Sequence, residues 1–215
     1  MEKSKHSISI QRTATVSLYG NTADAEYVWI VTHGYGMLAE FFIDKFEGLI
    51  NDKHLVICPE ALSRFYLEGM TGRVGATWMT SHHRDDEIKD YIQYLEHVYA
   101  HYVPATAKKV VLLGFSQGLS TISRWYMHTS QRADMLVGWG AAFPDDVLKN
   151  KKFGTIPTKV YIGLQDEFIP ENMRNAYIEK VKNSNLPIEL NYYEGKHTLE
   201  PLPLQALIDF VEHYL

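Results

Sequence analysis

The sequence predicts an α/β fold in which a mostly parallel central sheet is flanked by helices on both faces. Short apolar runs bounded by turn residues recur along the 215 residues, and segments with helical spacing lie between them. The later runs are apolar throughout, as expected for strands that are buried on both faces. Because 46% of the residues are hydrophobic, the chain can bury a sizeable core, and we expect a single domain over residues 1–215 with no large lid domain.

Eight segments have the composition of strands. The first two, 7–11 and 14–19, are short and closely spaced, so we expect them to pair as an antiparallel edge of the sheet. The other expected strands are 28–32, 55–58, 110–114, 135–138, 160–163 and 188–193.

Helices are predicted from apolar residues that recur at positions i, i+3 and i+4. This spacing runs from Ile88 to Tyr102, and the acidic run 85–87 precedes it, where negative charge suits the helix dipole. The same spacing predicts a last helix over 204–215 and a short early one over 42–50. Pro170 fits the first turn of a further helix over 171–181.

The segment 61–81 follows neither period and contains three glycines. Long irregular loops in compact domains are usually functional, so we expect this segment to face a ligand. On loop position alone, the candidate pocket walls are Phe65, Tyr66, Trp78, Met79 and, outside the segment, Phe143.

Charge and composition exclude several classes of protein. The net charge of −5 argues against a nucleic-acid partner, which would require clustered Lys and Arg. The first 13 residues lack the apolar core of a signal peptide, and no stretch reaches the roughly 20 apolar residues of a membrane span. We therefore expect a cytoplasmic protein without stable membrane association. Cys58 is the single cysteine, which excludes an intrachain disulfide, and we expect it to be a core residue.

Ser116 is the candidate nucleophile. It lies in the run Gly-Phe-Ser-Gln-Gly at 114–118, between a predicted buried strand and a predicted helix. A sharp strand-to-helix turn lifts such a serine clear of the sheet, and the flanking glycines avoid clashes with neighbouring elements. The start of the helix also offers unpaired N–H groups to a developing oxyanion.

A serine nucleophile needs a base, and the base needs an acid to orient it. Of the three histidines downstream, His128 and His213 lie in predicted helices, whereas His197 lies in a loop at the carboxyl edge of the sheet. Asp166 follows the strand 160–163 at the same edge and is our preferred acid, with Asp145 and Asp146 as rivals.

An oxyanion hole of this kind takes one backbone N–H from the residue after the nucleophile, here Gln117. A second comes from the loop after an early strand, here His-Gly-Tyr-Gly at 33–36, and we expect the amide of Tyr35 to provide it. His33 is expected to hold this loop in place rather than to act as a base.

The histidine pair His82-His83 could suggest a metal site. Neighbouring positions at a helix start point in different directions and do not converge on one ion, so we expect no metal.

Taken together, the motifs at 33–36, 114–118, 163–170 and 193–197 resemble those of the phospholipase/carboxylesterase family of α/β-hydrolases. The resemblance implies a triad of Ser116, Asp166 and His197, backbone donors at Tyr35 and Gln117, and no cofactor. The sequence departs from the family at Leu119, where a second glycine is common, and at Met37, where an acidic residue is common.

We therefore expect a carboxylesterase that hydrolyses small carboxylic esters through an acyl-enzyme on Ser116. The same groups would serve a lysophospholipase or an acyl-thioesterase, and these alternatives remain open. Two further hypotheses belong to other functional classes. The protein could be a non-catalytic binding protein built on the hydrolase fold, or a peripheral membrane module that uses aromatic residues of segment 61–81. A shortage of Lys and Arg in that segment weakens the last hypothesis.

Overall fold

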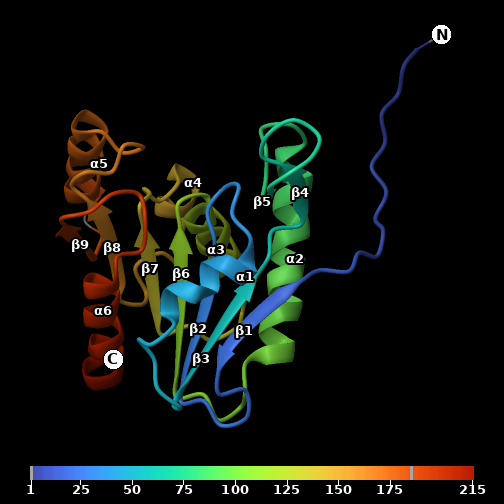
Figure 1. The fold of residues 1–215 in the computed structure, drawn as a ribbon. Helices are drawn as coiled ribbons and strands as arrows, with labels where there is room; N and C mark the ends of the chain where they lie inside the picture. The colour runs from blue at the N-terminus through green and yellow to red at the C-terminus, as the bar shows by residue number, and fades with distance from the viewer. Residues whose placement is uncertain (1, 185) are drawn as a thin grey trace.

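The computed structural model describes residues 2–184 and 186–215, and within them a seven-stranded sheet has the order β1-β3-β2-β6-β7-β8-β9 (Figure 1). Only β1 runs antiparallel to its neighbour in this described sheet, so the predicted fold class is confirmed. The strands are β1 (Val16–Gly20), β2 (Tyr27–Thr32), β3 (His54–Pro59), β6 (Lys109–Phe115), β7 (Met135–Trp139), β8 (Thr158–Gly163) and β9 (Ile188–Tyr193).

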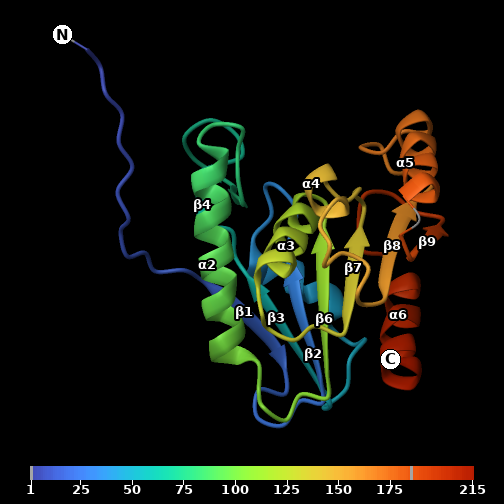
Figure 2. The ribbon, with the colours of Figure 1, turned by 180° about the vertical axis from the view of Figure 1, so that it is seen from behind.

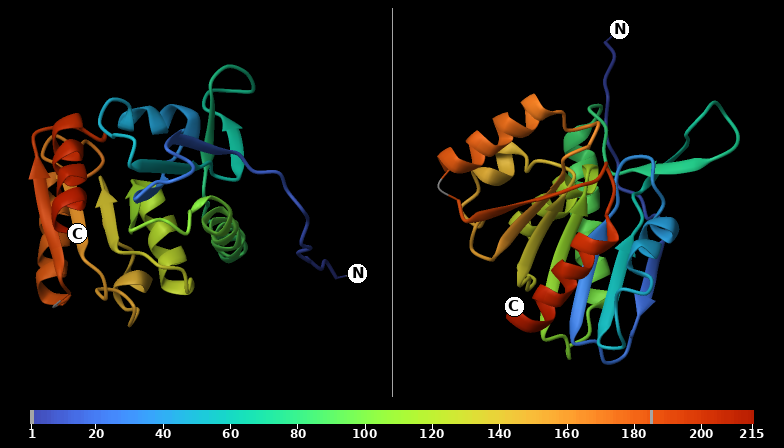
Figure 3. Two further views of the ribbon diagram at one scale, coloured as in Figure 1. Left: turned by 90° about the horizontal axis from the view of Figure 1, so that it is seen from below. Right: turned by 60° about the vertical axis from the view of Figure 1, so that its left-hand side comes forward.

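Helices cover both faces of the sheet and form a three-layered molecule (Figures 2 and 3). One face carries α2 (Arg84–Tyr102), α3 (Gln117–His128), α5 (Glu171–Ser184) and the short α4 (Asp145–Leu148). The other carries α1 (Ala39–Phe42), the 3-10 helix η1 (Ile43–Phe46) and α6 (Pro201–Tyr214). Within the described ranges, no helix is long and apolar enough to cross a membrane.

The central strands are apolar throughout because both of their faces are buried. In β6, Val110 and Leu112 pack with α2 and α3, whereas Val111 and Leu113 pack with α1 and α6. Alternate side chains thus join opposite cores, which explains why the sequence lacks the polar alternation of a one-sided sheet. Cys58 is fully buried, as predicted, and burial raises the pKa of its thiol well above the usual value.

The parallel strands all end at one edge of the sheet. The loops after β2, β6, β7, β8 and β9 therefore gather there, as expected for the ligand-binding edge of an open α/β sheet. The loop between β9 and α6 crosses this edge (Figure 1).

The predicted strand 7–11 is wrong. The N-terminal segment is extended but unpaired, and β1 instead pairs with β3. The alternating Ile8 and Ile10 side chains are 85% and 78% exposed, so they have no apolar surface to cover. The segment runs away from the rest of the molecule (Figures 1 and 2).

The segment 61–81 is more regular than predicted, because it contains an antiparallel hairpin of β4 (Ser63–Tyr66) and β5 (Val74–Thr77). Its glycines have structural roles. A Cβ atom on Gly75 would lie 2.4 Å from the carbonyl oxygen of Gly36, so this glycine lets β5 pack closely on the loop after β2. The early helix lies earlier in the chain than the predicted range 42–50, because α1 begins at Ala39 and η1 ends at Phe46.

Candidate active site

Ser116 occupies a strained turn between β6 and α3. Its φ of 53° and ψ of −121° are unusual for a residue other than glycine. Such a backbone conformation costs about 1–3 kcal/mol. A Cβ atom on Gly114 would lie 2.3 Å from Leu119 Cα, and one on Gly118 would lie 2.1 Å from the carbonyl oxygen of Thr32. Glycine is therefore required at both ends of the turn.

His197 and Asp166 are in direct contact. The Nδ1 atom of His197 donates to Asp166 Oδ2 at 2.7 Å, and the second carboxylate oxygen accepts from the amide of Phe168 at 2.9 Å. Asp166 is only 4% exposed. This arrangement fixes the tautomer of His197, so that its Nε2 atom carries the free lone pair.

Close backbone packing brings these two residues together. A Cβ atom on Gly163, at the end of β8, would lie 2.5 Å from the carbonyl oxygen of Gly195, and the amide of Gln165 donates to that same oxygen at 2.9 Å. The turn that carries Asp166 is thus bonded to the loop that carries His197.

Two phenylalanine rings flank the imidazole of His197. The ring centroid of Phe115 lies 4.8 Å from that of His197, and the centroid of Phe168 lies 4.7 Å from it. The imidazole of His197 therefore contacts two apolar rings that limit its rotation.

The rival acids have other partners. Asp146 accepts from Arg124 Nε at 2.7 Å, and this bond lowers the pKa of its carboxyl. Asp145 pairs with Lys180, which likewise lowers its pKa. His128 and His213 are exposed near the ends of α3 and α6. The arrangement favours Asp166 as the partner of the base.

The loop after β2 lies against Ser116. A Cβ atom on Gly34 would come within 3.2 Å of the Ser116 Cβ atom, which shows how closely the backbone passes the serine. No hydrogen bond between described residues engages the amide of Tyr35 or that of Gln117. Within the described part of the chain, both N–H groups therefore have no hydrogen-bond acceptor.

His33 has a structural place in this loop. Its Nδ1 donates to the carbonyl oxygen of Gly34 at 2.8 Å, and its Nε2 accepts from the amide of Ala61 at 3.0 Å. Burial lowers its pKa and keeps the ring neutral. With both nitrogens engaged, His33 has no lone pair left for substrate.

The side chain of Gln117 tethers segment 77–79 to the start of α3. Its Oε1 accepts from the amide of Trp78 at 3.1 Å, and its Nε2 donates to the carbonyl oxygen of Met79 at 2.8 Å. The side chain is thus committed to structure while its backbone amide remains open.

The pair His82-His83 does not form part of a cluster of possible metal ligands among the described residues. His83 lies just before α2 with a φ of 52°, and its Nδ1 is 3.8 Å from a carboxylate oxygen of Asp86. Among the described residues, no three His, Cys, Asp or Glu side chains cluster as a metal site requires.

A cleft of about 570 Å³ opens beside Ser116 and His197. Its remaining lining comes from the loops after β2, β7 and β8 and from α5. These residues are Gly34, Tyr35, Met37, Phe115, Gly140, Ala141, Ala142, Ile162, Glu167, Phe168, Ile169, Met173 and Tyr177. Most of them are apolar, so the cleft suits an apolar group bonded to a reacting carbonyl.

The five predicted pocket walls are not among the residues that line this cleft. Trp78 and Phe143 are buried core residues, and the indole of Trp78 donates to the carbonyl oxygen of His33. Phe65 packs on the ring of Tyr35, Tyr66 is half-exposed on the hairpin, and Met79 lies beside Arg124. These aromatic residues support the loops, whereas the cleft itself is lined from the ends of β6 and β8, from the loops after β2, β7, β8 and β9, and from α5.

Comparison with known proteins agrees with this architecture. The structure is similar to that of esterase PE8 (15% identity, 95% of this chain and 100% of the other, TM-score 0.72). It is also similar to acyl-protein thioesterase 2 from Zea mays (15% identity, 93% of this chain and 98% of the other, TM-score 0.71). A third similar structure is that of the Bacillus cereus carboxylesterase (11% identity, 93% of this chain and 93% of the other, TM-score 0.64). None of the curated proteins matches the sequence significantly. At these identities the structural likeness establishes the fold alone.

The family assignment comes from the sequence match. The phospholipase/carboxylesterase family model matches residues 18–215, which leaves out only the unpaired N-terminal segment and the first residues of β1. The chain therefore belongs to the phospholipase/carboxylesterase family of α/β-hydrolases.

Proposed function

We propose that this protein is a serine carboxylesterase that hydrolyses small carboxylic esters through an acyl-enzyme on Ser116. The observation that carries the proposal is the 2.7 Å bond between His197 Nδ1 and Asp166, made at the rim of a cleft that Ser116 also lines. A nucleophile, an oriented base and an apolar cleft are the parts that acyl transfer requires.

In the acylation step, Ser116 Oγ attacks the ester carbonyl while His197 Nε2 takes its proton. The carbonyl oxygen becomes an oxyanion, which the amides of Gln117 and Tyr35 stabilise. Asp166 stabilises the imidazolium that forms. As the tetrahedral intermediate collapses, His197 gives the proton to the departing alcohol, and the acyl group remains on the serine.

In the second step, water replaces the alcohol. His197 takes a proton from the water, whose oxygen attacks the acyl carbon, and the same two amides stabilise the second oxyanion. Collapse of this intermediate releases the carboxylic acid and returns the proton to Ser116. The cycle needs no other reactant, and we expect it to take place in the cytoplasm.

Labelling with a fluorophosphonate probe tests the proposal directly. We expect the wild-type protein to react and Ser116→Ala to remain unlabelled and to lose hydrolysis of short p-nitrophenyl esters. Ser120→Ala, one turn further along α3, is the matched control and should behave as wild type. If the wild type failed to label, the non-catalytic binding protein would be the better account.

The substrate class is tested by rate. We expect kcat/KM on short-chain oxygen esters to exceed that on acyl thioesters and long-chain lysophospholipids of matched acyl group. The opposite order would keep the mechanism but assign the protein to the thioesterases or lysophospholipases.

A further inference from the structure

A second groove of about 500 Å³ lies next to the catalytic cleft, on the side of α1 and the hairpin. Its apolar lining consists of Gly36, Met37, Leu38, Phe41, Phe42 and Val74. Phe41 is 66% exposed, so the groove presents an aromatic ring to solvent.

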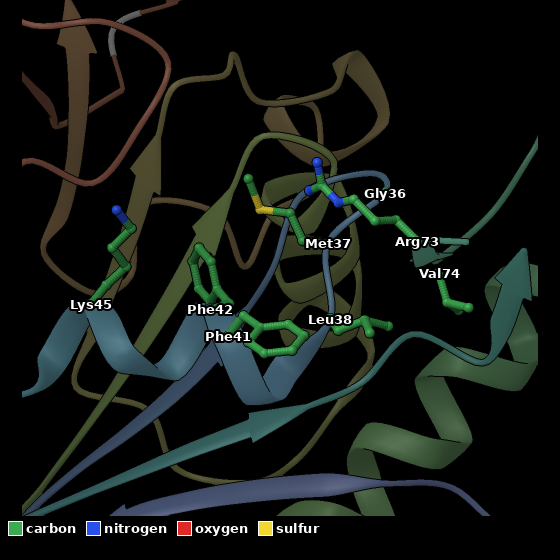
Figure 4. Close-up of a pocket in the computed structure, with 8 residues that line it drawn as sticks. All are labelled: Gly36, Met37, Leu38, Phe41, Phe42, Lys45, Arg73 and Val74. Carbon is green, nitrogen blue, oxygen red and sulfur yellow. The ribbon is translucent and has the colours of Figure 1, made fainter. Parts of the chain in front are cut away.

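Two cations complete the lining of this groove, Lys45 from η1 and Arg73 from the residue before β5. Figure 4 shows them on opposite sides of Met37, with their charged ends directed to the same side of α1. Within the described residues neither side chain has an ion-pair partner, although the acidic Asp44 is the sequence neighbour of Lys45. Both charges are therefore available to a ligand.

The groove and the catalytic cleft adjoin at Met37, which lines both. The lining of the catalytic cleft itself includes one carboxylate, that of Glu167. A substrate that extends from the cleft into the groove would meet two positive charges in the groove. On a chain with a net charge of −5, this local positive charge is distinctive.

We propose that the groove binds an anionic oxygen group, carboxylate or phosphate, carried by the ester substrate. Lys45 and Arg73 hold the anion, and the apolar floor receives the carbon chain that joins it to the scissile ester at Ser116. This inference rests on the proposed esterase function and narrows its substrates to esters with a negatively charged end. Met37, which carries no charge, keeps the connection between the two sites free of a group that would repel the anion.

The test compares matched pairs of esters that differ only in charge. In the acyl-side arm, the mono-p-nitrophenyl ester of suberic acid is compared with its ω-carboxamide. In the alcohol-side arm, the butyrate ester of ω-hydroxyhexanoate is compared with that of the corresponding amide, and a third pair replaces the carboxylate by phosphate. We expect the anionic member to have the higher kcat/KM in at least one arm, through a lower KM.

Variants assign this preference to the groove. We expect Lys45→Gln and Arg73→Gln each to reduce the anion-to-amide ratio of kcat/KM by about fivefold, and the double variant by about twentyfold. Arg73→Glu should invert the ratio. Arg12→Gln and Lys151→Gln remove exposed cations elsewhere and should leave the ratio unchanged.

Equal rates within every pair, or a ratio that the groove variants do not change, would overturn the inference while leaving the esterase proposal intact. Calorimetry with the Ser116→Ala protein separates the two proposals further. Binding of the anionic ester that weakens in Ser116→Ala/Arg73→Gln supports the groove without turnover. If the anionic ester did not bind to Ser116→Ala, or bound equally well to the Ser116→Ala/Arg73→Gln double variant, the groove would not be its binding site. Hydrolysis that did not depend on Ser116 would count against the proposed function alone.

Discussion

Gly140 lies against the ring of His197 so closely that a Cβ atom at position 140 would come within 3.2 Å of both Cε1 and Nδ1. It follows β7 in the left-handed region, with a φ of +61°. The glycine therefore has two functions: it completes a turn that other residues adopt at a cost, and it leaves room for the base. This glycine at a strand end was a sequence signal for the site, and it was missed.

Gly140→Ala should lower kcat/KM by about 10–100-fold, because the ring of His197 must shift away from the added methyl group. Stability should fall by about 1–2 kcal/mol from the left-handed backbone. Gly48→Ala is the matched control, since Gly48 has a φ of +73° but no atom within 4 Å of the position that an added methyl group would take. It should show the loss of stability in thermal unfolding but normal ester hydrolysis. Equal activity in the two variants would contradict the role given to Gly140.

Asp166→Asn should lower kcat by about 10⁴-fold, since an amide cannot stabilise the imidazolium and can present an N–H to Nδ1 of His197. The variant retains the oxygen that accepts from the amide of Phe168, so the turn should still form. Steady-state kinetics and circular dichroism would separate these effects. Asp145→Asn and Asp146→Asn should retain most activity, and a loss confined to either of them would identify a different acid.

The order of elements and the position of Ser116 could be predicted because they depend on local pattern. Apolar runs predict buried strands, and the glycines at 114 and 118 predict the close backbone packing that the structure has around Ser116. Chain order favoured Asp166 as the acid but left Asp145 and Asp146 as rivals, and the structural argument for Asp166 uses information that one sequence does not contain. It depends on Arg124 reaching Asp146 and on Gly163 packing against Gly195, and both are contacts between distant parts of the sequence.

Leu119 shows how a departure from the family pattern is accommodated. A Cβ atom on Gly138 would lie 2.8 Å from Leu119 Cδ2, so the leucine side chain occupies space that a glycine on β7 leaves open. Such compensation between a helix and the neighbouring strand is invisible in one sequence. For the same reason one sequence did not reveal the lining of this cleft, which comes from several loops at the carboxyl edge and from α5 and includes no residue of segment 61–81.

The stability of the protein should decrease as the pH falls below about 6.5, and His33 should contribute to this decrease. Burial lowers the pKa of His33 from its ordinary value of 6.5, so the unfolded chain takes up a proton at a pH where the folded protein does not. For one proton the slope approaches about 1.4 kcal/mol per pH unit. Carboxylates with a lowered pKa, such as Glu212, change the stability of the protein only at more acidic pH, below about 4.5.

Urea unfolding of wild type and His33→Gln between about pH 7.5 and pH 5.5 measures this contribution. The variant should be less stable at neutral pH, because the bonds to Gly34 and Ala61 are lost, yet its stability should depend less on pH. His128→Gln, which changes an exposed histidine at the end of α3, should keep the wild-type slope. Identical slopes in all three proteins would show that His33 does not titrate on unfolding.

Gln117→Leu should separate the backbone of Gln117 from its side chain. The substitution leaves the amide of Trp78 without its partner and removes one of the two donors to the carbonyl oxygen of Met79, so the free energy of unfolding should fall by about 1–3 kcal/mol. The backbone N–H proposed for the oxyanion remains, and kcat should therefore fall by less than about tenfold, against about 10²–10³ for loss of an oxyanion donor. Gln205→Leu, on the surface of α6, is the control for stability. A Gln117→Leu protein that folds but is as inactive as Ser116→Ala would mean that the side chain itself takes part in the chemistry.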